Sequence, residues 1–380
     1  MVAIDLAQIP VVDNHCHGLY RALVPLDVRA WRRLFTESRD PDIVDEHVPS
    51  TLFYRRLLRD LSRFFGCAPT EDAVLAARAA RDAPDLIRGF LQGANLQALL
   101  IDQGYPPPEQ VLPDAEVAAL VGCRMAPILR LEVLMQRLIA QHATLEAVSD
   151  ALRAALIDLR GQGYVALKSI VAYRTGLDIR SWPFDDARAA FALARREVEA
   201  TGAIRLAHQP LLDTLLWIAF AAAARQRIPV QFHCGYGDTD ADLRLGNPLH
   251  LRAVLEDPTC HSMPVVLLHA AYPYTREASY LAAVYEHVHL DLSYAIPFLG
   301  EAEMLGLTRA AVGVAPLTKL LYSSDAVGVP ELHWLGALTG RRVLGQVLGE
   351  CVDAGELSRA EAAAAGAGIL RDNALRLYRL

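Results

Sequence analysis

Two histidines separated by one residue follow an apolar run near the N-terminus. The segment VVDNHCH (11–17) has the character of a short β-strand that ends in polar residues. Residues two apart in a strand share a face, so His15 and His17 are expected to project together while Cys16 points away as core filler. Neutral imidazole is a common ligand of transition metals. The pair therefore predicts half of a metal site.

Seven further short apolar runs carry or precede a polar residue, and helical stretches separate them. In chain order they are 96–101 before Asp102, 125–131 with Arg130, 164–170 with Lys168, 228–232 before His233, 265–268 before His269, 288–292 with Asp291, and 320–324 before Asp325. Buried strands that alternate with helices indicate parallel strands joined by right-handed crossovers. Eight such strands predict an α/β fold, a distorted (β/α)8 TIM barrel. No Gly-X-Gly-X-X-Gly follows the first strand, which argues against a dinucleotide-binding sheet.

The chain is expected to form one barrel over residues 1–380. Within it, 19–96 is predicted to be a helical insertion after strand 1, because this part is Arg-rich and has helical spacing at 51–65 and 70–80. Residues 97–345 would hold strands 2–8, and 346–380 would form C-terminal helices. Barrels of this length with insertions are common.

Composition favours a small-molecule enzyme. The net charge is -7 and acids and bases are interleaved, which argues against a nucleic-acid surface. No window reaches the ~18 apolar residues of a membrane span, and the N-terminus has no signal-peptide pattern, so a cytoplasmic protein with no membrane partner is expected. The six cysteines form no spaced framework and are expected to be reduced. Base rates favour a homo-oligomer.

A barrel gathers its catalytic groups at the carboxyl ends of its strands. The predicted ligands there are His15, His17, Lys168, His233, His269 and Asp325. Imidazole and carboxylate donors suit one or two divalent ions, most of all zinc, with manganese, iron and nickel as alternatives. Such an ion lowers the pKa of a bound water from 15.7 to about 7, and Asp325 is expected to accept the proton. Lys168 would be carboxylated, paired with a carboxylate, or an exposed strand-end lysine.

Polar residues just beyond the strand ends are candidates for substrate contacts. They are Asp102, Arg130, Tyr173, Arg174, Tyr236, Asp238, Asp242 and His250. An arginine in an apolar strand needs an anionic partner, so Arg130 and Arg174 suggest a substrate carboxylate. The alternative for each is an internal pair, with Glu132 and Asp178 respectively. The other histidines, His333 among them, are expected to be surface or core residues.

Several segments carry a family resemblance. VVDNHCH, ALKSI, VQFHCGYGD, VVLLHAAYPY and LLYSSDA resemble the metal-ligand strands of the amidohydrolase superfamily, in its amidohydrolase-2 branch. The longer segments LKSIVAYRTGLDI, HCGYGDTDADLRLGNPLHLRAVLED and LLHAAYPYTREASYLAAVYEHVHLDLSYAIP resemble the N-terminal amidohydrolase domain of FluG and nodulin/glutamine synthetase-like proteins. In those fusions a glutamine synthetase domain follows. A ligase partner here would be a separate polypeptide.

The resemblance implies roles for the predicted ligands. His15, His17 and Asp325 would bind the first metal. In two-metal relatives the strand-4 lysine is carboxylated and bridges the ions, with the strand-5 and strand-6 histidines on the second. In one-metal relatives His233 joins the first set, and His269 becomes a catalytic or electrostatic group. Both arrangements are open for this sequence.

The expected reaction is hydrolysis of a small carboxylate-bearing amide by metal-activated water. Asp325 would be the general base, and His269 or the metal would polarise the carbonyl. A γ-glutamyl amide is the suggested substrate, because the related domains accompany glutamine synthetase-like ligases. The alternatives on the same residues are a non-oxidative decarboxylase, a sugar-acid isomerase and a non-catalytic signalling relative.

Overall fold

The fold contains eight strands in one sheet, in the order β1-β2-β3-β4-β5-β6-β7-β8. The computed structural model describes residues 3–380. The strands are β1 (Val11–Cys16), β2 (Leu96–Asp102), β3 (Arg124–Arg130), β4 (Ala166–Ser169), β5 (Val230–Phe232), β6 (Val265–Leu267), β7 (Val288–Ser293) and β8 (Leu320–Ser323). Parallel pairing joins β1 to β2 and runs from β3 through β7. All eight predicted strands are present.

Helices separate the strands, and the backbone brings the last strand beside the first. After β8, the Asp325 N–H donates to the His15 carbonyl at 3.1 Å, and the His17 N–H donates to the Ala326 carbonyl at 2.9 Å. A parallel sheet whose eighth strand returns to the first is a (β/α)8 barrel. The predicted fold class is confirmed.

The segment between β1 and β2 is the predicted helical insertion. It contains α1 (Val28–Arg33), η1 (Ile43–His47), η2 (Val48–Ser50), α2 (Leu52–Phe65), α3 (Glu71–Ala79) and α4 (Ala83–Gly93). Thr51 caps α2 by accepting the Tyr54 N–H at 3.2 Å, and Gly66 ends it in the left-handed conformation. Asp82 caps α4 in the same way, through the Asp85 N–H.

The remaining helices follow the strands. They are η3 (Pro108–Gln110), α5 (Asp114–Val121), α6 (Leu131–Gln141), α7 (Leu145–Ala155), η4 (Val171–Tyr173), α8 (Phe184–Thr201), α9 (Gln209–Gln226), η5 (Pro248–Leu251), α10 (Arg252–Glu256), η6 (His269–Ala271), α11 (Thr275–Val284), α12 (Glu301–Val312), η7 (Leu317–Lys319), α13 (Pro330–Asp353), α14 (Arg359–Ala367), η8 (Gly368–Asp372) and α15 (Asn373–Tyr378). Among residues 3–380, no helix is long and apolar enough to cross a membrane.

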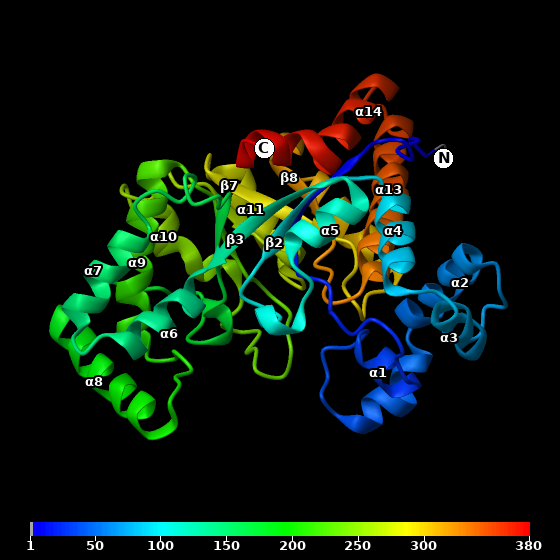
Figure 1. Cartoon of the computed structure of the whole chain (residues 1–380). Helices are drawn as coiled ribbons and strands as arrows, with labels where there is room; N and C mark the ends of the chain where they lie inside the picture. Colours follow the sequence, from blue (N-terminus) through cyan, green and yellow to red (C-terminus); the bar gives the residue numbers. More distant parts are fainter. Residues whose placement is uncertain (1–2) are drawn as a thin grey trace. The chain divides into compact units, whose positions relative to one another are not determined.

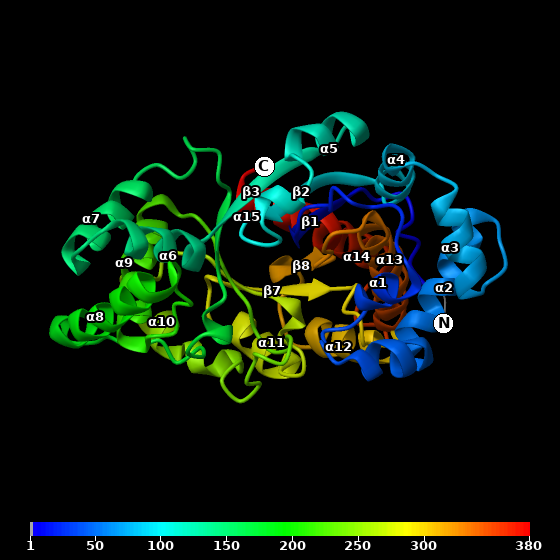
Figure 2. The same cartoon turned by 60° about the horizontal axis from the view of Figure 1, so that its bottom comes forward.

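The chain divides into two compact units, each with its own packing. The first unit holds residues 3–125, 237–239 and 291–375, and the second holds 126–236, 240–290 and 376–380. In the first unit, α4 lies alongside α13 in both cartoon views (Figures 1 and 2). In the second, α6, α7, α8 and α9 form one group of neighbouring helices (Figures 1 and 2). The predicted site residues fall into both units, so each group is described separately.

Candidate active site

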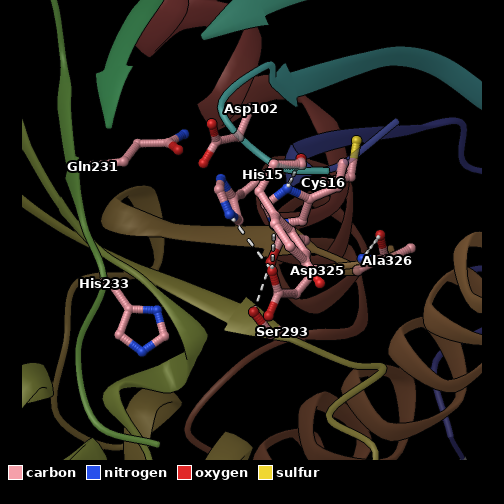
Figure 3. Close-up of polar contacts among 12 residues, drawn as sticks. His15, Cys16, Asp102, Gln231, His233, Ser293, Asp325 and Ala326 are labelled. Carbon is pink, nitrogen blue, oxygen red and sulfur yellow. Dashed lines mark hydrogen bonds and ion pairs between the residues drawn. The ribbon is translucent and has the colours of Figure 1, made fainter. Parts of the chain in front are cut away.

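Two histidines and one carboxylate converge in the first unit. The Nε2 atoms of His15 and His17 lie 3.5 and 3.6 Å from the same oxygen, Oδ1 of Asp325. The two imidazole rings have centroids 5.1 Å apart and stand nearly perpendicular. Figure 3 shows His15 reaching from β1 to Asp325. The prediction that His15 and His17 project together is confirmed.

A hydrogen bond at Nδ1 determines which ring nitrogen of His17 carries the proton. His17 Nδ1 donates to the carbonyl of Tyr105 at 2.8 Å, so a neutral ring carries its proton there and presents the Nε2 lone pair to Asp325. A lone pair facing a carboxylate oxygen is favourable when a cation lies between them. Metal-binding histidines commonly donate their other ring N–H to a carbonyl or carboxylate in this manner. The donor set therefore fits a divalent metal.

Asp102, predicted only as a candidate for substrate contacts, lies close to the predicted metal ligands. Its carboxylate is fully buried at the end of β2, and its ligand atom lies within 4.8 Å of those of His15 and His17. It lies beside His15 in Figure 3. One oxygen also accepts the Gly104 N–H at 2.9 Å, which orients the group. The signal in the sequence was a carboxylate directly at a strand end.

Asp325 occupies an unusual backbone conformation, with a φ of 55°. Its side chain is 18% exposed, whereas that of His15 is fully buried. Aspartate tolerates the left-handed region better than most residues, but a single residue held there generally depends on its surroundings. The conformation turns the chain sharply at the carboxyl end of β8, at the point where the Asp325 carboxylate meets the histidines.

A fully buried polar network lies next to these ligands. Asn14 donates to Asp291 Oδ2 at 2.8 Å and to the Tyr322 carbonyl at 2.9 Å. Ser293 donates to the other oxygen of Asp291 at 2.8 Å and shares a hydrogen bond with Ser323. Each carboxylate oxygen of Asp291 thus has a donor, as burial of a charge requires. Cys16 packs in a core cluster with Leu99, Ile101 and Cys123, which confirms its expected role as filler.

The second unit contains the other predicted ligands. His233 and His269 follow β5 and β6, with ring centroids 4.5 Å apart, and both are almost fully buried. His233 Nε2 donates to the Tyr236 carbonyl at 2.6 Å, so its Nδ1 keeps the lone pair in the neutral ring. Lys168 lies on β4 and is 1% exposed. The alternative of an exposed strand-end lysine was therefore wrong.

The chain after β6 makes a left-handed turn that positions His269. His269, Ala270 and Ala271 have φ values of 63°, 51° and 48°. The neighbouring loop after β5 packs closely against this turn, because the Tyr236 N–H donates to the Tyr272 carbonyl at 2.8 Å. A side chain at Gly235 would come within 2.1 Å of that carbonyl oxygen. Three successive residues in the left-handed region are rare outside functional sites.

The arginines of the second unit lie close to one another. Arg205 donates to the Tyr173 carbonyl at 2.9 Å, and Arg174 approaches the same oxygen at 3.5 Å. Burial and the charge of Arg205 lower the pKa of Arg174, whose Nε makes no hydrogen bond among residues 3–380. Asp178, the alternative partner of Arg174, instead accepts from Arg180 at 2.8 Å.

Glu132, the alternative partner of Arg130, is fully buried. It accepts the Ser169 hydroxyl at 2.7 Å and the Ile170 N–H at 3.0 Å. Burial raises the pKa of Glu132, while the Ser169 hydrogen bond and the nearby Arg130 lower it. The positive charge of Arg130 therefore favours the ionised form of Glu132, against the larger effect of burial.

The remaining predicted substrate residues divide between ion pairs of the loop after β5 and the surroundings of the two buried histidines. Asp238 pairs with Arg39 of the insertion at 2.7 Å within the first unit. Asp242 pairs with Arg244 in the loop after β5, where its side chain is 38% exposed. Tyr173 and Tyr236 lie beside the histidines, with ring centroids 4.4 Å from His233 and 5.5 Å from His269 respectively. His250 is exposed and contacts the Arg244 carbonyl.

The insertion contributes a carboxyl that the sequence analysis missed. Glu37 follows α1 and is half-buried in the first unit. Burial, followed by the charges of Asp325 and Asp238, raises the pKa of Glu37 to about 7, against the smaller lowering by Arg33. No strand ends near Glu37 in the sequence, so strand-end reasoning could not single it out.

Comparison with known proteins agrees with this geometry. The amidohydrolase family model matches residues 181–380. FluG of Emericella nidulans is 30% identical over 98% of this chain and 46% of FluG, so the chain spans about half the length of that relative.

Solved structures extend the likeness over the whole chain. A Lactobacillus casei protein provisionally described as a metal-dependent hydrolase is 30% identical, with a TM-score of 0.88 over 99% of this chain and 98% of that one. A uronate isomerase from Thermotoga maritima, 15% identical over 98% and 95% of the two chains with a TM-score of 0.68, shares the fold. The family model and the L. casei relative together establish that this chain belongs to the amidohydrolase family.

Proposed function

We propose that this protein is a metal-dependent hydrolase that cleaves the amide bond of a small carboxylate-bearing substrate. The convergence of two imidazole Nε2 atoms on one Asp325 oxygen, at 3.5 and 3.6 Å, carries the proposal. Where each Nε2 presents its lone pair, these three atoms repel one another in a mostly buried position unless a cation joins them. Nitrogen and oxygen donors of this kind favour zinc, with manganese, iron and nickel as alternatives.

His15, His17 and Asp325 would hold the first ion, with Asp102 close by. We assign His233, His269 and Lys168 to the same reaction by their places at the ends of β5, β6 and β4. Either they would hold a second ion, with Lys168 carboxylated, or His269 would polarise the substrate carbonyl. A bound divalent ion lowers the pKa of water and polarises a carbonyl oxygen.

Asp325 is the proposed general base. The other oxygen of its carboxylate would accept a proton from the attacking water, while Oδ1 faces the histidines. The same carboxyl would return that proton to the departing nitrogen, so that the amine leaves neutral. The partial exposure of Asp325 leaves room for water and substrate on that side.

The arginines support an anionic substrate. Arg174 is half-buried beside another cation, Arg205, and this arrangement becomes favourable when a carboxylate binds. Arg130 would assist from β3. Tyr173, Tyr236, Asp238 and Asp242 would complete the substrate contacts. A γ-glutamyl amide has the required carboxylate next to a hydrolysable amide.

We expect a cytoplasmic enzyme that acts as a homo-oligomer on a small molecule. A glutamine synthetase-like ligase is the partner that we propose in the same pathway, from the resemblance to FluG, of which this chain covers 46%.

Metal content and amide hydrolysis test the proposal together. Protein purified without chelator is expected to contain at least one divalent ion per chain and to release amine from γ-glutamyl amides. Asp325→Asn is expected to abolish turnover and keep the fold. Asp150→Asn is the matched control, because Asp150 is 79% exposed and pairs only with Arg153 among the described contacts. Full metal content without hydrolysis of any amide, or full turnover by Asp325→Asn, would refute the assignment.

A further inference from the structure

The backbone on both sides of Asp325 is tied to one neighbouring side chain. The Ser324 N–H donates to Asp13 Oδ1 at 2.9 Å, and the Ser324 hydroxyl donates to Asp13 Oδ2. That hydroxyl also accepts the Ala326 N–H at 3.0 Å. Asp13 therefore holds the residue before Asp325 directly and the residue after it through Ser324.

The contacts of Asp13 are completely shielded from solvent. Asp13 and Ser324 are both 0% exposed, and His333 of α13, 1% exposed, places Nδ1 3.6 Å from Asp13 Oδ2. A buried carboxylate is costly unless donors or cations surround it. Here two hydrogen bonds from Ser324 and the imidazole of His333 surround Asp13. His333 was expected to be an ordinary surface or core residue, and the structure places it in this cluster.

Asp13, Cys16 and His333 also have the composition of a metal site, with ligand atoms within 4.8 Å of one another. Each oxygen of Asp13, however, already accepts a donor from Ser324. The Cys16 sulfur faces the Leu100 carbonyl at 3.4 Å, and burial raises the pKa of its thiol well above the ordinary value, so the thiolate form is disfavoured. The contacts fit a structural cluster better than a second ion.

We propose that Asp13 is a positioning residue that sets the geometry of the metal ligands by clamping Ser324 and thereby holding Asp325 in its left-handed conformation. The inference rests on the proposed metal-dependent function. Asp325 also donates its own N–H to the His15 carbonyl, so the three consecutive N–H groups 324–326 are all bonded. A non-glycine residue with positive φ is retained where its surroundings fix it in this way. Loss of the clamp lets Asp325 relax away from His15 and His17.

A pair of matched serine substitutions tests this role. Ser324→Ala removes the hydroxyl that bonds Asp13 and Ala326. Ser293→Ala removes an equally buried hydroxyl on β7 whose bonds go to Asp291 and Ser323 instead. Asp13→Asn gives a second variant, because an amide NH2 group replaces one of the two oxygens that accept from Ser324. Each purified protein is stripped of metal and titrated with Zn²⁺ against a chelator, and its Co²⁺ form is examined by visible absorption spectroscopy.

Ser324→Ala and Asp13→Asn are expected to weaken Zn²⁺ binding by about 10- to 100-fold and to change the Co²⁺ spectrum, as for other residues that orient metal ligands. The Zn²⁺ affinity of Ser293→Ala should stay within about threefold of the wild-type affinity, because this substitution leaves the contacts around Asp325 intact. Circular dichroism of the metal-free proteins checks the fold. Wild-type affinity and spectrum in Ser324→Ala would overturn the positioning role alone. Failure of the wild-type protein to bind any divalent ion would overturn the proposed function as well.

Discussion

A buried ion pair joins the insertion to the C-terminal part of the first unit. Arg78 of α3 and Glu331 of α13 are 1% and 0% exposed, and Arg78 Nε donates to Glu331 Oε1 at 2.6 Å. Arg78 also donates to the Leu23 carbonyl at 2.6 Å, and its guanidinium lies 5.3 Å from the centre of the Trp31 ring. Removal of Arg78 alone therefore leaves a buried carboxylate and a buried carbonyl without their donor.

We expect Arg78→Met to lower the free energy of unfolding by about 3 to 5 kcal/mol, the usual cost of breaking a buried pair from one side. Glu331→Met should cost a similar amount, because it strands the arginine. The double variant should lose far less than the sum, about 1 to 3 kcal/mol, since only the Leu23 carbonyl is then left unpaired. The coupling between the two sites is accordingly at least about 3 kcal/mol.

Guanidinium titrations followed by circular dichroism and tryptophan fluorescence would measure these energies. Arg88→Met and Asp85→Met provide the matched control, because that pair is 2.9 Å apart but 44% and 58% exposed. Exposed pairs contribute about 0 to 1 kcal/mol. A loss below about 1 kcal/mol in Arg78→Met, or strict additivity in the double variant, would refute the claim that this pair stabilises the insertion.

Two further predictions concern the surroundings of Asp325. The pKa of Glu37, raised from 4.5 to about 7, means that the folded chain holds a proton which the unfolded chain releases, so stability falls as pH rises through this window. In urea titrations of the metal-free proteins, the free energy of unfolding of Glu37→Gln should match that of wild type near pH 4.5 and exceed it by about 1 to 3 kcal/mol at pH 8. The control Glu303→Gln changes an exposed carboxyl and should follow wild type at both pH values. A difference between Glu37→Gln and wild type that does not vary with pH would contradict this. Gly328→Ala should destabilise by more than about 1 kcal/mol, because Gly328 has a φ of 77° and a new Cβ would lie 2.0 Å from the Tyr20 ring. Gly306→Ala, in open space on α12, should instead stabilise by about 0.5 to 1 kcal/mol in thermal melts, and equal effects of the two substitutions would contradict this reasoning.

The barrel was predictable because parallel strands have a strong local signature. Each strand is a short buried run between helices, and the predicted runs match the observed strands to within about two residues at most ends, as for 96–101 and β2 (Leu96–Asp102). Helices of the insertion were equally local, since the helical spacing at 51–65 corresponds to α2 (Leu52–Phe65). Such signals depend on neighbouring residues and need no knowledge of tertiary contacts.

The ligand types at strand ends were predictable for the same reason, but their partners were not. The sequence could pair His15 with His17 by alternation, whereas the contact of both with Asp325 depends on the return of β8 beside β1. Glu37 lies in the loop after α1 and His333 lies on α13, so neither follows an apolar run that predicts a strand. Their contributions come from how the insertion and α13 pack in the first unit, which local patterns do not encode.

Strand β1 shows most clearly what alternation leaves out. Its pairing with β2 shifts register between Asp13 and Cys16, so strict two-residue alternation does not hold across the motif. A register shift of this kind redirects side chains, as β-bulges beside active sites do. As a result Asp13 bonds Ser324 next to His333, while His15 and His17 face Asp325. The short motif can thus supply two metal ligands and also fix the turn that carries the third, which explains why a single strand controls both the donors and their geometry.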